Sequence, residues 1–450
     1  MSIRRYSRRP AVSAERTAVS AERTAVTAKR AAVTVAAVVA AVSGFAFAPG
    51  PGDATAQPST TTTPFTTPNT DGCPNKTTPP SPIDSSEVPE PGQTAPGPLP
   101  IPDPPVGGKA LGGCGVLLPA GAGPLPEGIS ATAWEVADLD TGKVIAAKDP
   151  HGRYRPASTI KVLLASVAIP ALDLDKTIVG TQDDANADGT RVGIGPGGRY
   201  TNKQLFQALI MASGNDAAHA ISTQLGGDDA TVAKMNALAK QLRALDTRAA
   251  TPSGLDGPGM SISAYDLALL FRHAMTLPLF AELIHTEQVD FPGFPANPKI
   301  PDDKDHPGFP IANDNHLLYE YDGAIGGKTG YTDDARQTFV AAAARNGHRY
   351  VVTLLKADVR PFRPWEQAAK LLDYAFALPA GASIGTMPDA SGKTPESSVA
   401  LASPPTPDAA QPAPADDGSD HHALRIALMV GGVALVVVLL LAARRVSRRR

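Results

Sequence analysis

One interval of this 450-residue chain, residues 127–378, carries the hydrophobic periodicity that lets a polypeptide bury a core. The flanking segments 57–125 and 380–423 are rich in Pro, Thr, Gly, Ala and Ser and poor in large apolar residues. Neither flank can bury a core by itself. About 250 residues suffice for one well-cored domain. The sequence therefore predicts a single folded domain over 126–379, between a flexible segment and a flexible tether.

Strand-like runs lie at both ends of this interval, and helical runs fill its middle. Residues 337–356 form two apolar, β-rich runs joined by Asn-Gly, which is a strong hairpin signal. Residues 129–147 similarly contain two apolar runs around an Asp-Thr-Gly-Lys turn. Runs of helical spacing and length cover 159–169, 202–211, 216–224, 230–245, 264–275 and 364–377. This order predicts an α+β domain, an antiparallel sheet flanked by helices.

Each end of the chain holds an apolar segment next to basic residues. Residues 31–48 are apolar, follow a repetitive basic stretch, and precede Ala54-Thr55-Ala56, a small-x-small cleavage site. This pattern predicts an export signal over 1–56, although an uncleaved N-terminal anchor would read the same way.

The second apolar segment predicts a transmembrane helix over 424–443. It is long enough to cross a bilayer, and the basic tail 444–450 follows it directly. Arginines beside a span favour the cytoplasmic side. We therefore expect a single-pass protein of the cell membrane whose folded domain is extracytoplasmic.

Charge and cysteine content agree with an exported domain. The chain has 41 basic and 44 acidic residues, so nothing predicts a nucleic-acid partner. Its two cysteines, Cys73 and Cys114, permit one internal disulfide, which is the bond expected in an oxidising compartment.

Ser158 and Lys161 form an S-x-x-K pair. Pro156 precedes a helix-like run, so Ser158 would lie in the first helical turn and Lys161 on the same face. A serine hydroxyl is a weak nucleophile until a neighbour takes its proton. Lysine can do this when burial or another cation lowers its pKa. Alone, the pair is equally typical of a capping serine beside a surface lysine.

Two further polar motifs follow along the chain. Ser213 and Asn215, separated by one glycine, lie between two predicted helices and could relay a proton and bind a peptide backbone. Lys328 and Thr329 offer a positive charge and a hydroxyl to a substrate that ends in a carboxylate, and Gly330 would let a backbone come close. Taken singly, each motif is also compatible with an ordinary turn.

In this order, the three motifs are those of class A β-lactamases and penicillin-binding proteins. PASTIK at 156–161, the segments 189–218 and 251–270, and GGKTGYTDDA at 326–335 extend the similarity over the whole predicted domain. The chain resembles the low-molecular-weight D-Ala-D-Ala carboxypeptidases, the S11 serine peptidases. Many relatives carry a second β-rich domain, which the tether and predicted span replace here.

The resemblance implies a β-lactamase/transpeptidase-like fold with a helical subdomain, and a penicillin-binding enzyme. Ser158 would be acylated by the penultimate D-Ala of a peptidoglycan stem pentapeptide, and water would release the product, which limits cross-linking. Lys161 would be the general base, with Ser213 and Asn215 assisting. β-Lactams would acylate Ser158 as substrate mimics.

The resemblance also implies the substrate-binding residues. Lys328, Thr329 and Gly330 would bind the substrate's carboxylate end. The backbone N–H groups of Ser158 and Tyr331 would form the oxyanion hole. Whether water or another peptide's amine is the acyl acceptor stays open at this point.

Two other functions compete with this interpretation. A class A-like β-lactamase needs a glutamate between the second and third motifs, and residues 214–281 contain none. A catalytically silent cell-wall-binding module would not need all three motifs.

No metal and no cofactor are expected. Residues 184–189 match the opening of an EF-hand loop, but Gly195 stands where its bidentate glutamate should be.

Overall fold

The computed structural model describes residues 65–389, and residues 66–389 fall in one compact unit. The predicted export signal, the transmembrane helix, the basic tail and most of the C-terminal tether lie outside the described residues. Among the described helices, none alone has the length and apolar character to cross a bilayer. The pair Ala264–Ala274 and Pro278–His285, bent by 109°, meets those criteria only together.

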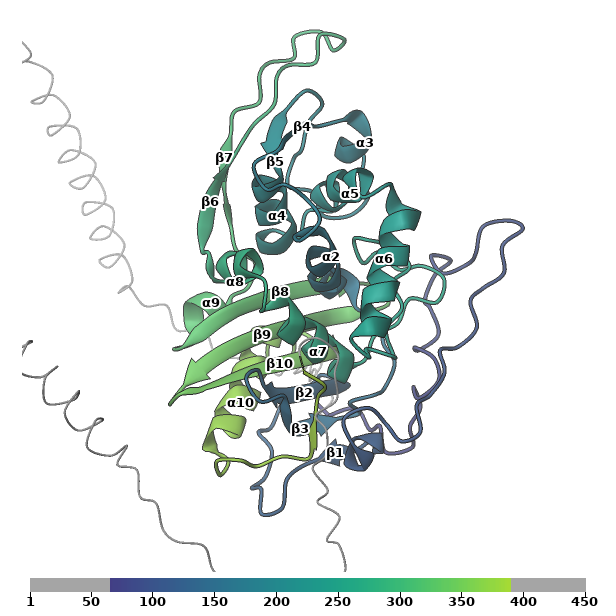
Figure 1. Cartoon of the computed structure of the whole chain (residues 1–450), viewed down its shortest axis with the longest axis vertical. Coiled ribbons are helices and arrows are strands. Elements are labelled where there is room, and N and C mark those ends of the chain that lie inside the picture. The colour runs from purple at the N-terminus through teal and green to yellow at the C-terminus, as the bar shows by residue number, and fades with distance from the viewer. Residues whose placement is uncertain (1–64, 390–450) are drawn as a thin grey trace, which may run out of the picture. The chain divides into compact units, whose positions relative to one another are not determined.

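A seven-stranded antiparallel sheet forms the centre of the domain (Figure 1). Its strands run in the order β1-β3-β2-β10-β9-β8, with β11 also paired to β3. The bounds are β1 Val116–Leu117, β2 Ala133–Asp138, β3 Lys143–Lys148, β8 Ala324–Thr332, β9 Arg336–Arg345, β10 His348–Ala357 and β11 Gly385–Thr386. Strand β8, which carries the Lys-Thr-Gly motif, is therefore an edge strand.

Helices cover both faces of this sheet. Helix α10 packs on one face, where Leu371 and Leu372 join a core with Val352 and Leu354 of β10. Helix α7 packs on the other face, and the remaining long helices form a helical subdomain beyond it. The long helices are α2 Lys161–Ala168, α4 Asn202–Met211, α5 Asn215–Gln224, α6 Asp228–Gln241, α7 Ala264–Ala274, α8 Pro278–His285 and α10 Pro364–Ala377. The predicted α+β class is confirmed.

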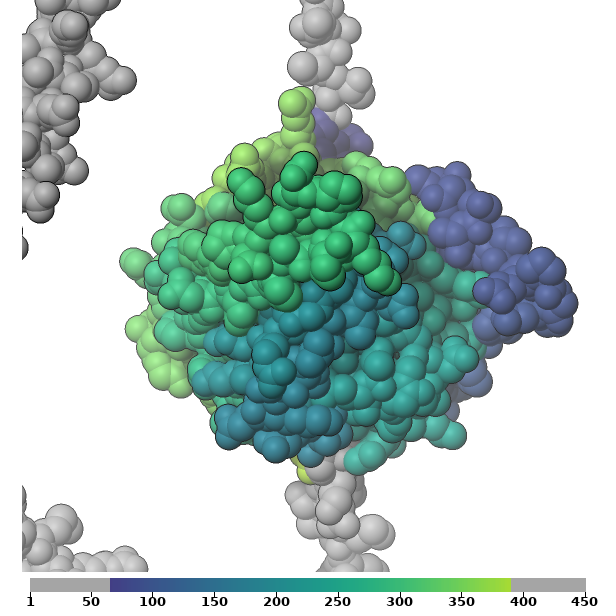
Figure 2. Space-filling model, turned by 90° about the horizontal axis from the view of Figure 1, so that it is seen from above, coloured from purple at the N-terminus to yellow at the C-terminus, as the bar shows by residue number. Residues whose placement is uncertain are grey.

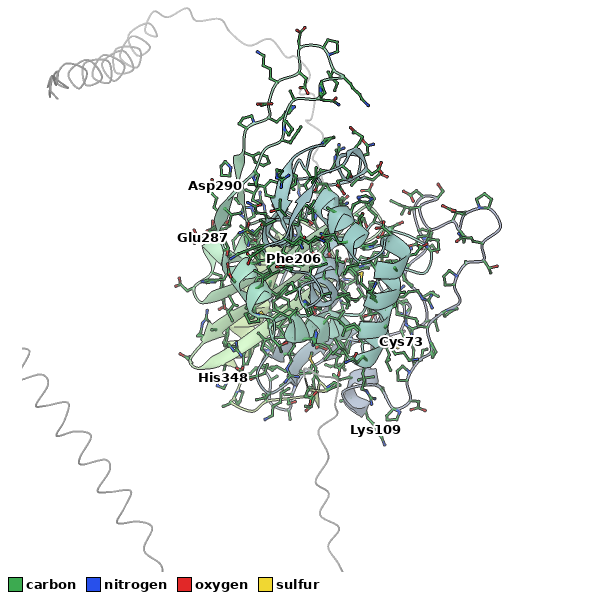
Figure 3. All side chains as sticks on the ribbon, turned by 45° about the horizontal axis from the view of Figure 1, so that its top comes forward. Cys73, Lys109, Phe206, Glu287, Asp290 and His348 are labelled. Atoms are coloured by element: carbon green, nitrogen blue, oxygen red, sulfur yellow. A yellow bond between two sulfur atoms is a disulfide. The ribbon has the colours of Figure 1, made fainter. Side chains whose placement is uncertain are left out.

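Several short elements lie in the helical subdomain or against the central sheet. They are the one-turn helices α3 Gln182–Ala185 and α9 Leu317–Glu320, the 3₁₀ turns η1 Lys109–Gly112 and η2 Ala157–Ile160, and two small antiparallel pairs, β4 Thr177–Val179 with β5 Arg199–Thr201 and β6 Gln288–Phe291 with β7 Phe309–Ala312. Figure 3 shows Phe206 of α4 in the interior, whereas Asp290 of β6 lies on the arm that projects from the subdomain.

The β9–β10 hairpin forms where the Asn-Gly signal predicts it. Arg345 pairs with His348, and the two residues between them, Asn346 and Gly347, have φ of 52° and 80°. Positive φ at both positions is the signature of the turn whose twist matches a β-hairpin. This hairpin fixes β9 and hence the register of β8 beside it.

The segment that precedes the domain differs from expectation. We call residues 66–115 the N-terminal strap. A disulfide joins Cys73 to Cys114 within it, so the expected pairing is present. The buried Arg153 of the domain donates hydrogen bonds to three strap carbonyls, those of Thr77 (2.8 Å), Leu99 (2.6 Å) and Pro100 (2.9 Å). Figures 1 and 2 show the strap as a ridge along one side of the molecule.

The prediction of a flexible segment over 57–125 is therefore wrong for its described part. Composition alone could not reveal this, because the strap is held by two buried cations, Arg153 and Lys148, that bind its backbone carbonyls, and not by an apolar core of its own. The predicted domain, 126–379, is also too short at both ends, because β1 and β11 pair with β3. Two-residue strands carry no detectable periodicity.

Candidate active site

Ser158 lies in η2, the 3₁₀ turn that leads into α2, and the α-helix itself begins at Lys161. The turn is clamped from two sides. Thr338 of β9 donates a hydrogen bond to the carbonyl of Pro156 (2.7 Å). Gly254, with φ of 91°, lies so close that a Cβ there would be 2.0 Å from the Ala157 carbonyl oxygen. Ala157 itself has φ of 47°, a strained conformation of the kind that clusters at functional sites.

Lys161 makes three short contacts through its Nζ atom. Nζ lies 2.9 Å from Ser158 Oγ, and 2.7 Å from both Asn215 Oδ1 and the Ser253 carbonyl oxygen. The side chain is fully buried. Burial, and then the charge of nearby Lys328, hold the pKa of Lys161 well below its ordinary value, although Asp216 opposes this shift.

A neutral Lys161 would suit this environment. The neutral amine has two N–H bonds and one lone pair, and the two acceptors, Asn215 Oδ1 and the Ser253 carbonyl, can take both N–H bonds. The lone pair then faces Ser158 Oγ, which can donate its proton. The arrangement is that of a general base within hydrogen-bonding distance of a nucleophile.

Asn215 is held in one orientation by the loop that precedes it. Its Nδ2 donates to the Asp188 carbonyl (2.7 Å) and its backbone N–H to the Thr190 carbonyl (2.7 Å). Oδ1 therefore faces Lys161, so Asn215 holds Lys161 Nζ in place. Ser213, two residues earlier, is buried with φ of 59°. Ser213 and Asn215 belong to one motif in the sequence, but no sequence pattern predicts the contact between Asn215 and Lys161.

Buried Asp216 fixes the loop that orients Asn215. Its carboxylate accepts hydrogen bonds from the backbone N–H groups of Val192 (3.2 Å), Gly193 (2.8 Å) and Ile194 (2.9 Å). Neither this role of Asp216 nor that of Ser253 could be predicted from the sequence, because a carboxylate or a carbonyl that binds a distant segment leaves no local pattern.

The EF-hand-like stretch has a structural explanation. Asp184 closes a capping box with Thr181 at the start of α3 and lies 2.6 Å from His219 Nδ1. Asp188 contributes its backbone carbonyl to Asn215. These contacts make the stretch a support for the active-site loop, not a calcium loop.

Strand β8 brings the third motif against Ser158. Lys328 is buried, donates to the Thr329 carbonyl (2.8 Å), and has its pKa lowered to about 8 by burial, against the opposing effect of Asp314. Gly330 touches the η2 turn, because a Cβ there would lie 2.8 Å from Ser158 N and 2.4 Å from Thr338 Oγ1. The structure thus brings together all three sequence motifs. The Tyr331 side chain is half exposed, and its hydroxyl donates a hydrogen bond to Asp333 Oδ1 (2.6 Å).

Gly330→Ala is expected to slow acylation of Ser158 by about 100-fold, because a methyl group cannot fit between β8 and η2 and a displacement of about 1 Å can cost this much. The measurement is the rate of covalent labelling by a fluorescent penicillin. Gly123→Ala is the matched control, since a Cβ at Gly123 meets nothing within 4 Å. Labelling of the Gly330 variant at the rate of the control would contradict the close contact.

A pocket of about 670 Å³ lies beside Thr329. Arg360, Arg363 and His316 line it together with Asp314. Two arginines in the lining of a pocket that also includes Thr329 can attract a carboxylate. These arginines belong to no motif in the sequence. Their place a few residues after the predicted β9–β10 hairpin is the signal that could have identified them.

A second group of titratable residues lies away from Ser158. His151, Asp246 and Asp266 have the mutual spacing of metal ligands. His151, however, lies 2.8 Å from Asp246 through Nδ1 and 3.0 Å from the Val106 carbonyl through Nε2. With acceptors at both nitrogens the ring is an imidazolium, which has no lone pair for a metal. Arg153 also pairs with Asp246 at 3.2 Å. The group is a buried ion-pair network.

Glu135, near this network, should make stability depend on pH. It is fully buried, its carboxylate oxygens have no hydrogen-bond partner, and burial raises its pKa to about 8. Because the pKa of Glu135 is higher in the folded than in the unfolded state, its protonation contributes to folding stability. This contribution is fully present below the unfolded pKa, about 4.5, and is lost as the pH rises through the folded pKa, about 8. Glu135→Gln should therefore gain stability relative to wild type between those pH values, by up to about 1.4 kcal/mol per pH unit.

Thermal unfolding at pH 5 and pH 8 measures this difference. Glu127→Gln, at an exposed glutamate, is the control. Equal pH slopes for wild type and Glu135→Gln would show that Glu135 ionises without penalty.

Comparison with known proteins adds independent information. Residues 121–359 match the family model of peptidase S11, D-alanyl-D-alanine carboxypeptidase. The D-alanyl-D-alanine carboxypeptidase DacB2 of Mycobacterium tuberculosis is 48% identical over 275 residues, which cover 60% of this chain and 90% of that protein. DacF of Bacillus subtilis is 30% identical over 246 residues, 53% of this chain, and the match spans only 60% of that protein.

Solved structures show the same fold. The D-alanyl-D-alanine carboxypeptidase from Mycobacterium tuberculosis H37Rv has a TM-score of 0.55 and 47% identity, and covers 60% of this chain and 99% of its own. The Streptomyces K15 DD-transpeptidase has a TM-score of 0.51 and 26% identity, and covers 57% of this chain and 100% of its own. The matched family segment, 121–359, includes every proposed catalytic residue and begins after the strap.

Proposed function

The chain belongs to the S11 serine peptidases, the D-alanyl-D-alanine carboxypeptidases, and from this premise we propose that Ser158 is the residue that becomes acylated. As a serine-type carboxypeptidase with the penicillin-binding fold, it cleaves a D-Ala-D-Ala bond. The observation that carries the assignment of Ser158 is the contact with Lys161, whose two other partners leave a lone pair for the Ser158 proton.

In the acylation step, Ser158 Oγ attacks the carbonyl carbon of the penultimate D-Ala and its proton passes to Lys161 Nζ. The backbone N–H groups of Ser158 and Tyr331 stabilise the oxyanion. The tetrahedral species then collapses, the C–N bond breaks, and the leaving D-Ala amine takes a proton from Lys161 by way of the Ser213 hydroxyl. Water attacks the resulting ester with the same base, and the shortened peptide leaves.

The substrate's terminal carboxylate would be bound next to β8. Lys328 supplies a buried positive charge, Thr329 a hydroxyl, and Arg360 with Arg363 two guanidinium groups around the adjoining pocket. This arrangement suits the free carboxylate of a stem pentapeptide, and trimming that peptide would limit cross-linking.

The test is incubation of the full-length protein in detergent with a muramyl pentapeptide, followed by assay of free D-Ala. Release of D-Ala is expected, with glycine added as an amine acceptor giving little exchange product. Uptake of penicillin without D-Ala release would contradict the peptidase role. Mainly exchange product would instead indicate a transpeptidase.

A β-lactamase activity has no support at the corresponding position. Residues 214–281 contain no glutamate, and the next one, Glu282, is exposed and pairs with Lys203 at 2.9 Å. Residues 214–281 therefore offer no glutamate to activate a deacylating water in the class A manner.

The location of the enzyme is also a proposal. An apolar run followed by arginines supports a membrane span over 424–443, and the Cys73–Cys114 disulfide is typical of an exported domain. Digestion of intact spheroplasts with protease should remove the domain and leave a membrane-bound fragment. Protection of the domain in intact spheroplasts would place it on the cytoplasmic side.

A further inference from the structure

The N-terminal strap meets the active site at Arg155, three residues before Ser158. The Arg155 side chain is 1% exposed, and its Nε donates a hydrogen bond to the carboxylate of Glu87 in the strap. A guanidinium stays charged when it is buried, so its environment must supply a carboxylate. Glu87, 15% exposed, provides that carboxylate from outside the predicted domain.

Two other carboxylates influence Arg155 at the same place. Asp334 and Asp256 both interact electrostatically with it. Asp334, in the turn after β8, accepts a hydrogen bond from the Ile83 backbone N–H of the strap (2.7 Å). Asp256, three residues after Ser253, is hydrogen-bonded to Thr332, the last residue of β8.

Three catalytic segments therefore converge on this junction. Arg155 lies three residues before the nucleophile, Asp256 three residues after the carbonyl that holds Lys161, and Asp334 four residues after Gly330. The strap contributes Glu87 and the Ile83 backbone to the same point.

The connection from Arg155 to Ser158 is stiff. Pro156 has its φ fixed by its ring, and its carbonyl accepts hydrogen bonds from Thr338 Oγ1 (2.7 Å) and from Thr159 N (3.2 Å). Ala157 is held at φ of 47° against Gly254. Because the backbone between Arg155 and Ser158 is held in this way, a displacement of Arg155 would also displace Ser158.

We propose that Glu87 is a positioning residue of the active site, which holds Arg155 and thereby sets Ser158 against Lys161 and β8. This role rests on the proposed acylation of Ser158. Because Glu87 lies outside the matched family segment, 121–359, family membership does not account for it. The strap is then part of the working enzyme as well as of its fold.

The test compares Glu87→Gln with Glu90→Gln in the full-length protein. Glu90 is an exposed glutamate of the same strap. Glu87→Gln keeps the side-chain shape but removes the charge, and acylation by a fluorescent penicillin should slow by about 10- to 100-fold. The kcat for D-Ala release should fall with little change in KM, measured at a temperature where circular dichroism shows a folded protein. Glu90→Gln should match wild type.

Each outcome decides a specific point. If the Glu87→Gln protein is labelled as fast as wild type, the positioning role is wrong. The same holds if the variant has a changed KM but an unchanged kcat for D-Ala release. Wild type that does not label at all overturns the proposed role of Ser158 instead. If Glu87→Gln does not fold, Glu87→Asp replaces it, because the charge is kept and only the reach is shortened. Wild-type kinetics in a folded Glu87→Asp protein would equally count against the proposal.

Discussion

Ser158→Ala should abolish covalent labelling by penicillin and reduce D-Ala release by about 10⁴-fold or more, because no other group can take over the acyl transfer. The methyl group fits where the hydroxyl was, so the fold should be unchanged. Labelling is read on a gel and release by a D-amino-acid oxidase assay.

Ser166→Ala is the control for this experiment. Ser166 lies in α2, two turns after the nucleophile, and its hydroxyl donates only to the Val162 carbonyl of the same helix (2.8 Å). That variant should label and turn over normally. If Ser158→Ala still formed a covalent penicillin adduct, another residue would be the nucleophile.

Lys161→Met should lower the acylation rate by about 10²- to 10⁴-fold, the usual contribution of a general base. Methionine keeps an unbranched apolar stem in the buried site but has no amine. The neutral amine is the active form, and the pKa of Lys161 is depressed, so the wild-type rate should rise with pH through that depressed pKa. The variant should lose this acid limb.

Rates of acylation measured from pH 5 to pH 9 test both parts. Lys176→Met, at an exposed lysine, should keep the wild-type profile. An unchanged acid limb in Lys161→Met would assign the titration to another group and leave Lys161 with an orienting role only.

Local patterns in the sequence predicted much of the fold. Helices α4 and α10 begin and end where the spacing predicts, and the Asn346-Gly347 turn forms the expected hairpin. Ser158 and Lys161 are neighbours because they are three residues apart in one turn, which a sequence shows directly.

The remaining contacts of the site depend on segments far apart in the chain. The Ser253 carbonyl reaches Lys161 across 92 residues, and Glu87 reaches Arg155 across 68. Neither contact involves a recognisable motif, because a backbone carbonyl has no sequence signature and a single glutamate in a Pro-rich segment resembles any solvated residue. Such contacts become visible only when the tertiary packing is known.

The position of β11 affects how the domain can bear mechanical load. Strand β11, Gly385–Thr386, pairs with β3 near one edge of the sheet, whereas β8 with Lys328 and Gly330 forms the opposite edge. A pull on the chain at the C-terminal end of β11 would enter the sheet on the side away from β8. Strands β3, β2, β10 and β9 lie between β11 and β8, so such a force would have to pass through four other strands before it changed the spacing between Gly330 and Ser158.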